Sequence, residues 1–201
     1  MNNAPNVGQA APPFRLRSVQ GELVALESYR GRHHLILWFS RGISCPFCRS
    51  YMENVSAGYE QLRAQGIEVV QVAPNLLESA RIFFRQQMPP YPFVCDPDKQ
   101  LFAVYGLGDR GVLEATRNTI VSFSHAAAHG DLRQTVRGSW LDVANRNFIR
   151  RLHHHAMTAV EQGIFVVARD GVIRYRSVLG PLDAIPSAPE LLRLSQAVLD
   201  G

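Results

Sequence analysis

Two cysteines, Cys45 and Cys48, lie three residues apart in the segment FSRGISCPFCRSYM, which spans residues 39–52. A pair with this spacing can cycle between two thiols and one disulfide, or it can supply half of a zinc site. The chain has one further cysteine, Cys95, so no second pair completes a zinc site. The sequence therefore predicts redox chemistry at the pair, with no metal and no other cofactor.

The residues around the pair predict which sulfur attacks. A buried strand is expected to end at Ser40, and Pro46 suits the first turn of a helix, so Cys45 falls at a helix N-terminus. Unpaired backbone N–H groups and the positive end of the helix dipole favour a thiolate at that place. Cys48 lies one turn further on and is expected to be less exposed. Cys45 is thus the predicted attacking thiol, and Cys48 the predicted resolving thiol.

Other residues near the pair are candidates for supporting roles. Arg41 and Arg49 flank it and could stabilise a thiolate or orient a peroxide, although each is equally consistent with a surface charge. Ser44 and Pro46 complete the turn into the helix. Cys95 is a candidate second resolving thiol, but its position at the end of an expected strand favours a buried structural cysteine.

The seven histidines raise the question of a metal site. His125 and His129 have the i, i+4 spacing that can share one helix face, and His153, His154 and His155 are consecutive. Nothing acidic or thiol-bearing sits at neighbouring positions to complete a site. Solvated histidines, or histidines at a subunit interface, are therefore the favoured interpretation.

The positive charge is concentrated in one part of the chain. Arginine supplies nearly all of it, since Lys99 is the only lysine, and residues 110–160 carry the equivalent of the whole net charge of +4. Seven arginines there face three acids: Arg110, Arg117, Arg133, Arg137, Arg146, Arg150 and Arg151 against Glu114, Asp131 and Asp142. Nucleic-acid binding usually needs a denser basic stripe on a recognisable module, so we expect a solvated or interface surface and no nucleic-acid partner.

Length and composition suit one globular domain. The chain has 201 residues, of which 46% are hydrophobic and 19% charged, and this excludes disorder as the dominant state. The longest apolar run, residues 35–39, is far shorter than the ~20 residues that cross a bilayer. Residues 1–13 have neither a basic start nor an apolar stretch, so no secretory signal and a cytoplasmic location are expected.

The hydrophobic pattern alternates between strands and helices for most of the length. Strands are predicted at residues 24–26, 34–40, 67–73, 92–94, 164–168 and 172–178, and helices at 46–65, 76–87, 98–105 and 189–199. The second helix is expected to end because of the Pro89-Pro90 pair. This order predicts an α/β fold with a mixed sheet covered by helices on both faces. Residues 111–161 interrupt it and are predicted to form a helical insertion within a single domain, 1–201.

The chain resembles a known family in several segments. Residues 7–48 are similar to the opening of the alkyl hydroperoxide reductase and thiol-specific antioxidant family, the peroxiredoxin-like branch of the thioredoxin superfamily. The shared positions are Val7, Gly8, Ala11, Pro12, Phe14, Leu16, Gly21, Val24, Leu26, Tyr29, Arg30 and Gly31. Residues 91–107 resemble the segment after the family's third core strand, and residues 163–178 resemble its closing hairpin. The CPFC sequence itself looks more like the pairs of thioredoxins, glutaredoxins and disulfide oxidoreductases.

The resemblance implies a thioredoxin-like fold and an antioxidant peroxidase. In that scheme the Cys45 thiolate attacks a hydroperoxide to give a sulfenic acid. Cys48 then forms a disulfide with it, which an external thioredoxin or glutathione system reduces. Two alternatives remain open: a thiol-disulfide oxidoreductase in which Cys45 attacks a protein disulfide, and a non-enzymatic redox sensor whose pair switches a surface of the insertion. We further expect no membrane partner and a homo-oligomer, namely a dimer.

Overall fold

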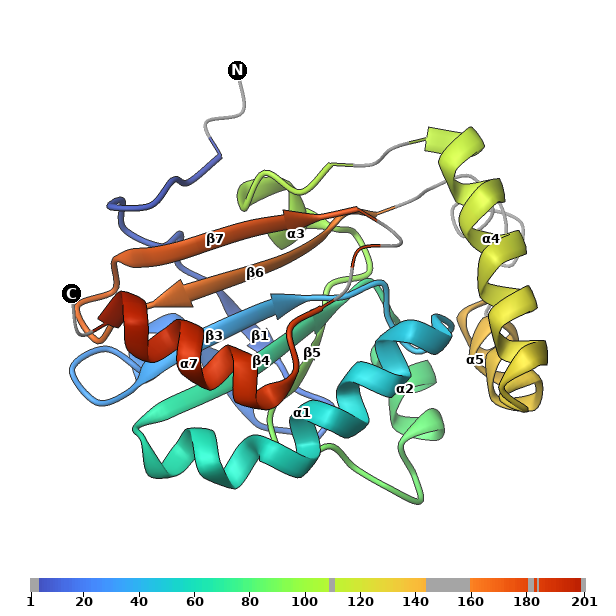
Figure 1. Cartoon of the computed structure of the whole chain (residues 1–201), viewed down its shortest axis with the longest axis horizontal. Helices are drawn as coiled ribbons and strands as arrows, with labels where there is room; N and C mark the ends of the chain where they lie inside the picture. The colour runs from blue at the N-terminus through green and yellow to red at the C-terminus, as the bar shows by residue number, and fades with distance from the viewer. Residues whose placement is uncertain (1–3, 109–110, 144–159, 181–182, 184, 200–201) are drawn as a thin grey trace.

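The structure is a computed structural model of the whole chain, and it describes residues 4–108, 111–143, 160–180, 183 and 185–199. A five-stranded sheet in the order β5-β4-β3-β6-β7 forms its centre (Figure 1). Its strands are β3 (His34–Phe39), β4 (Ile67–Ala73), β5 (Phe93–Cys95), β6 (Gln162–Val167) and β7 (Ile173–Leu179). A separate hairpin comprises β1 (Arg15–Arg17) and β2 (Leu23–Ala25). The helices are η1 (Leu26–Ser28), α1 (Pro46–Ala64), α2 (Leu77–Phe83), α3 (Gln100–Val104), α4 (Gly111–Ala128), α5 (Leu132–Val143) and α7 (Ala188–Leu199).

Strand β3 lies at the centre of the sheet, and its side chains alternate between two apolar cores, one on each face. β3, β4 and β5 run parallel, and parallel neighbours need crossover connections, which α1 and α2 provide. Ile36 and Trp38 point into one apolar core, whereas Leu35, Leu37 and Phe39 point into the other. Because the three strands are parallel, their C-terminal ends lie along one edge of the sheet, where α1 begins.

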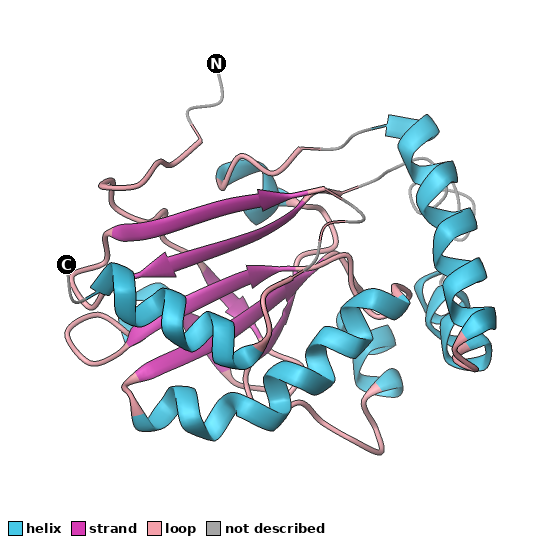
Figure 2. Ribbon diagram, in the orientation of Figure 1, coloured by secondary structure: helices cyan, strands magenta, loops and turns pink. Residues whose placement is uncertain are grey.

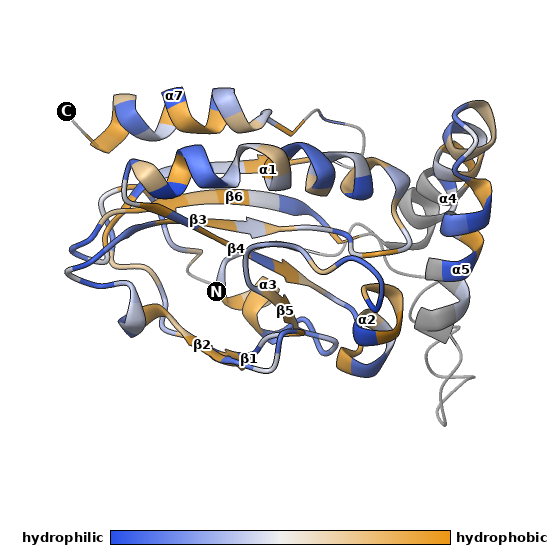
Figure 3. Ribbon diagram, turned by 90° about the horizontal axis from the view of Figure 1, so that it is seen from below, coloured by the Kyte–Doolittle hydropathy of each residue, from blue (hydrophilic) through white to orange (hydrophobic). Residues whose placement is uncertain are grey.

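Each face of the sheet is covered by a different set of elements. Helices α1 and α7 lie together on one face, and α3 with the β1-β2 hairpin lies on the other (Figure 3). An aromatic cluster anchors the second face: the Phe39 ring centroid is 5.0 Å from those of Phe102 and Tyr105. Each such edge-on or tilted pair adds about 0.5–1.5 kcal/mol beyond the burial of its area. The end of β3, which leads to the cysteines, is therefore firmly packed.

Helices α4 and α5 stand beyond one end of the sheet, next to the start of α1 (Figures 1 and 2). We call Gly111–Val143 the α4–α5 hairpin; α4 packs on α1, and α5 packs on α2. It occupies the first part of the predicted insertion, while residues 144–159, with the three consecutive histidines, lie outside the described residues. Of the helices in the described part of the chain, none is long and apolar enough to cross a membrane.

The predicted mixed sheet covered by helices is confirmed, and three of the differences in its elements matter most. Helix α2 ends at Phe83 rather than at residue 87; the next residue, Phe84, is 5% exposed and its ring meets that of Phe93 edge-on, with 4.9 Å between the centroids. Strand β1 was not predicted at all. Strand β6 begins two residues earlier than predicted, because Gln162 pairs with Leu179 of β7. This last difference affects the candidate site.

Candidate active site

The loop between β3 and α1 contacts the loop between β4 and α2, which lies at the same edge of the sheet. Gly42 adopts φ +90°, and a Cβ atom there would lie 2.2 Å from Asn75 Oδ1, so only glycine fits. The backbone N–H of Ile43 donates to the same oxygen at 3.2 Å. Asn75 lies between β4 and α2, so the two loops hold each other and fix where α1 starts.

This loop places Cys45 at the N-cap of α1, where the sequence predicts it. Its Sγ accepts the backbone N–H of Cys48 at 3.2 Å, and Pro46 occupies the first helical turn. Cys45 is 6% exposed and Cys48 is fully buried, and both are free thiols. Of the two sulfurs, Cys45 is therefore the nearer to solvent, as expected for an attacking group.

The environment separates the pKa values of the two thiols. Burial alone raises the pKa of Cys45, but the Cys48 side chain, the Arg41 charge, the Cys48 backbone N–H and the Arg49 charge together lower it from 9.0 to about 6. Burial and the hydrogen bond with Cys45 raise the pKa of Cys48 well above 9.0. At neutral pH the pair is thus a thiolate at Cys45 and a thiol at Cys48.

Arg41 is the cation that faces the pair. Among the described residues, its buried Nε and Nη2 atoms have no hydrogen-bond partner. Burial lowers the pKa of Arg41, but its charge and hydrogen-bond interactions with the cysteine pair, of which the charge of Cys45 is the largest, outweigh burial and raise it. A buried guanidinium is costly without a counter-charge, so a thiolate at Cys45 compensates Arg41 as much as Arg41 stabilises the thiolate.

Arg49 connects the cysteine loop to the α4–α5 hairpin. It is 7% exposed, and its Nη1 donates to the Ile43 carbonyl at 2.8 Å. Its Nη2 forms an ion pair with Asp131 and donates to Thr135 Oγ1 at 2.5 Å. Arg49 is therefore no surface charge: it fastens the hairpin to the start of α1. The sequence predicted Arg49 but neither of its partners.

A ring contact adds to this connection. The Phe47 ring, from the middle of the CPFC sequence, lies 4.2 Å from the His125 ring of α4, which stacks on His129 at 4.0 Å. Burial and the proximity of His129 lower the pKa of His125, which favours a neutral imidazole against Phe47. The described residues hold no cluster of three histidine, cysteine or acidic side chains that could bind a metal. The His125–His129 pair thus packs on the cysteine segment.

Gln162 is a further contact of the pair, which the sequence did not predict. The Cys48 thiol donates to Gln162 Oε1 at 3.4 Å, and Gln162 is only 1% exposed. It is the first residue of β6, on the strand next to β3. The hydrophobic pattern predicted that this strand begins at residue 164, which placed Gln162 in a loop. Nothing in the sequence therefore indicated that Gln162 lies at the site.

The remaining predicted residues take peripheral places. Ser44 lies half-buried in the turn before Cys45. Cys95 ends β5 beside Ala73 of β4, two strands away from β3, and is 9% exposed. Its role as a second resolving thiol stays a prediction.

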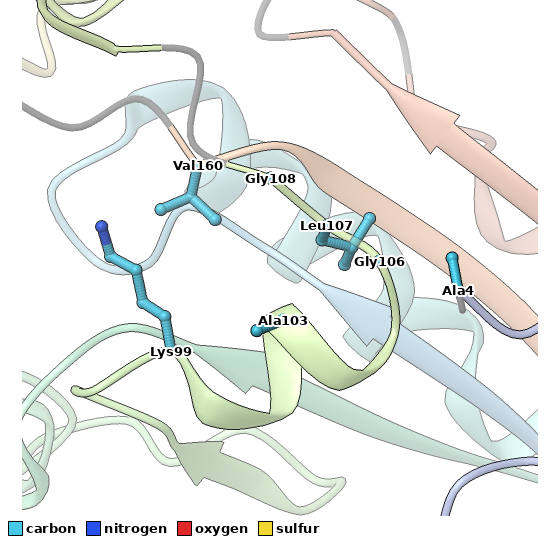
Figure 4. Close-up of a pocket in the computed structure, with 7 residues that line it drawn as sticks. All are labelled: Ala4, Lys99, Ala103, Gly106, Leu107, Gly108 and Val160. Carbon is cyan, nitrogen blue, oxygen red and sulfur yellow. The ribbon is translucent and has the colours of Figure 1, made fainter. Parts of the chain in front are cut away.

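A hollow of about 350 Å³ lies on the opposite face of the sheet from α1 (Figure 4). Its described lining is small and apolar apart from one lysine and includes no cysteine: Ala4, Lys99, Ala103, Gly106, Leu107, Gly108 and Val160. The candidate site is therefore defined by the cysteines and their contacts, and not by this hollow.

Comparison with known proteins gives a consistent result. The model of the AhpC/TSA family matches residues 7–126. A Mycobacterium tuberculosis protein named as a peroxiredoxin is 29% identical over 99 residues, which make up 49% of this chain and 62% of that protein. Alkyl hydroperoxide reductase E of Mycobacterium bovis is 23% identical over 147 residues, 69% of this chain and 95% of its own length. The match thus spans less than two thirds of the first of these relatives.

Among solved structures, the reduced 2-Cys peroxiredoxin of Plasmodium vivax superposes with a TM-score of 0.64. The alignment covers 96% of this chain and 81% of that one at 12% sequence identity. At this identity the likeness concerns the fold alone, and it confirms the predicted thioredoxin-like architecture.

Proposed function

Because the chain belongs to the AhpC/TSA family, we propose that it is a thiol-dependent peroxidase in which Cys45 attacks the peroxide and Cys48 resolves the product. The observation that carries the proposal is the contrast between the two thiols. Cys45 is an N-cap thiolate with a pKa of about 6, and Cys48 keeps its proton. A nucleophile and a proton-bearing partner on one helical turn are what a two-step thiol oxidation needs.

In the first step the Cys45 sulfur attacks the terminal oxygen of a hydroperoxide. A sulfur–oxygen bond forms, the O–O bond breaks, and the product alkoxide takes a proton to leave as an alcohol or, from hydrogen peroxide, as water. Arg41 supports this step, because its cationic charge stabilises the attacking thiolate. A cation beside the reacting sulfur would also stabilise the negative charge that develops on the leaving oxygen.

In the second step the Cys48 sulfur attacks the sulfenic sulfur of Cys45. The S–S bond forms, the S–O bond breaks, and the Cys48 proton leaves with the hydroxyl group as water. Two electrons and two protons from an external dithiol, or from two thiol molecules that form a disulfide with each other, then restore both cysteines. We propose a thioredoxin- or glutathione-type reductant, a cytoplasmic location and a homodimer as parts of the same account; light scattering on the purified chain tests the dimer.

A thiol-disulfide oxidoreductase is the second candidate, and the CPFC spacing favours it. Such an enzyme must bring a protein disulfide against its attacking sulfur. Cys45 is 6% exposed and lies near the packed Phe47–His125 contact, which leaves little access for a protein substrate. A small hydroperoxide suits this site better.

The test is hydroperoxide consumption with a dithiol reductant, compared between the native protein, Cys45→Ser and Cys48→Ser, with Cys95→Ser as the matched control. We expect consumption to be lost in Cys45→Ser, to be strongly reduced in Cys48→Ser and to be unchanged in Cys95→Ser. Equal rates in the first two variants and the native protein would rule out a catalytic pair. Insulin reduction measured in parallel, active without peroxide consumption, would favour the oxidoreductase instead.

A further inference from the structure

The buried amide of Gln162 is in contact with the resolving sulfur although 114 residues separate it from Cys48. Its Oε1 accepts the Cys48 thiol proton at 3.4 Å, and both residues are almost completely shielded from solvent. A buried amide without a partner costs about 1–3 kcal/mol, so such groups are placed where they hydrogen-bond. The Gln162 amide oxygen meets this requirement through its contact with the Cys48 sulfur.

The backbone on both sides of Gln162 fixes this orientation. Before it, the Glu161 N–H donates to the Gly108 carbonyl at 3.1 Å, and the Glu161 carboxylate accepts the Gly108 N–H at 2.9 Å. After it, a Cβ atom at Gly163 would lie 2.9 Å from Leu107 Cδ2, so this position has no room for a side chain. Gln162 itself pairs with Leu179 of β7. Its side chain is thus presented to Cys48 by a rigid strand end.

The second step of the proposed reaction gives this contact a chemical role. While the Cys48 sulfur attacks the sulfenic sulfur of Cys45, its S–H bond becomes more acidic. A hydrogen bond from that proton to a carbonyl oxygen therefore strengthens towards the transition state. The proton still leaves with the departing hydroxyl group as water, and the amide stays unchanged. An uncharged acceptor also avoids placing a second negative charge beside the Cys45 thiolate.

We propose that Gln162 is a further catalytic residue of this site, which holds the Cys48 thiol proton and directs the resolving sulfur at Cys45. The proposal rests on the proposed peroxidase function, because disulfide formation requires that Cys45 has first been oxidised.

A single-turnover experiment separates the two steps. The reduced protein is mixed with one equivalent of hydrogen peroxide, quenched at successive times with dimedone and a thiol-alkylating reagent, and analysed by mass spectrometry. Gln162→Met keeps an unbranched side chain of similar length but removes the carbonyl. Because a neutral hydrogen bond is worth about 0.5–1.5 kcal/mol, we expect disulfide formation to slow by about two- to thirteenfold relative to sulfenic acid formation.

Gln71→Met is the matched control, since Gln71 is a fully buried amide on β4 that bonds Ser40 and Tyr91 instead of a sulfur. The ratio of the two rates should stay at its native value in this control. An unchanged ratio in Gln162→Met, or an equal change in Gln71→Met, would overturn the proposal. Absence of both sulfenic acid and the Cys45–Cys48 disulfide in the native protein would instead overturn the peroxidase function on which the proposal rests.

Gln162→Glu is a second variant, which keeps the shape of the side chain and replaces the amide by a carboxyl group. It tests the contact independently of the Gln162→Met variant. Its added negative charge disfavours a thiolate at Cys45. The pH midpoint of sulfenic acid formation should therefore move upward from its native position. A midpoint that does not move, together with a native rate of disulfide formation, would show that this side chain does not act on the pair, and would refute the proposal.

Discussion

Replacing Arg41 by methionine tests whether one charge makes Cys45 reactive. The substitution keeps an unbranched apolar chain and removes the guanidinium. In the native protein the Arg41 charge is among the contributions that lower the pKa of Cys45 from 9.0 to about 6. An opposite charge close by shifts a pKa by about 1–3 units, so we expect the pKa of Cys45 in Arg41→Met to rise by about that amount.

The size of the effect on reactivity follows from the thiolate fraction. A thiol with a pKa of about 6 is roughly 90% ionised at pH 7, and a rise of about two units leaves roughly a tenth ionised. The thiolate fraction of Cys45 at pH 7 should therefore fall about tenfold, and its alkylation rate should fall by a smaller factor, because a more basic thiolate is intrinsically more nucleophilic. Because the native pKa is lowered, the native rate should level off above about pH 6, whereas the variant's rate should continue to rise. In alkaline solution, where Cys45 is ionised in both proteins, the rate of the variant should reach or exceed the native rate.

The assay is iodoacetamide alkylation across this pH range, with the modified cysteine located by mass spectrometry. Arg63→Met is the matched control, because Arg63 is an exposed arginine near the other end of α1 that pairs with Glu60 and Glu68. Its loss should leave the Cys45 profile unchanged. The reasoning is refuted if Arg41→Met keeps the native midpoint, or if Arg63→Met shifts it equally.

Two substitutions test the supports of the site. Asp131→Asn leaves Arg49 without its counter-charge and should lower the free energy of unfolding in urea by about 1–2 kcal/mol, a modest range because the Asp131 side chain is 30% exposed. It should also speed alkylation of the attacking thiol by a bulky maleimide, and an unchanged rate would mean that the hairpin does not restrict access. Gly42→Ala should destabilise by about 1–3 kcal/mol, because its Cβ meets Asn75 Oδ1 at 2.2 Å. Gly21→Ala has a similar φ but an open surrounding, so a loss as large there would contradict this contact argument.

The local parts of the site could be predicted because their signals are local. The continuous apolar run of residues 34–40 predicted a buried strand, and the structure has β3 at His34–Phe39. Pro46 marked the start of α1, which fixed Cys45 at its N-cap and Cys48 one turn on. In each case a few adjacent residues determine the backbone geometry, so their order along the chain carries the information.

The partners of the pair could not be predicted, because tertiary packing selects them. Gln162 reaches Cys48 across 114 residues and Asp131 reaches Arg49 across 82. Neither acceptor stands in a pattern that distinguishes it from any other polar residue of the chain. Arg49 illustrates the limit well: its position beside the pair was evident, but whether it faced solvent or the partly buried carboxylate of Asp131 depended on where the α4–α5 hairpin docks.

In the proposed reaction, the Cys45 thiolate is the group that hydroperoxide oxidises. The most direct test of this role is the site of oxygen addition when Cys48→Ser and Cys45→Ser are each mixed with one equivalent of hydrogen peroxide and trapped with dimedone. We expect a stoichiometric adduct on Cys45 in Cys48→Ser, formed with a pH midpoint near the pKa of Cys45, and no adduct forming at a comparable rate on Cys48 in Cys45→Ser. Rapid oxidation of Cys48 in Cys45→Ser, with Cys45 unmodified in the other variant, would contradict it.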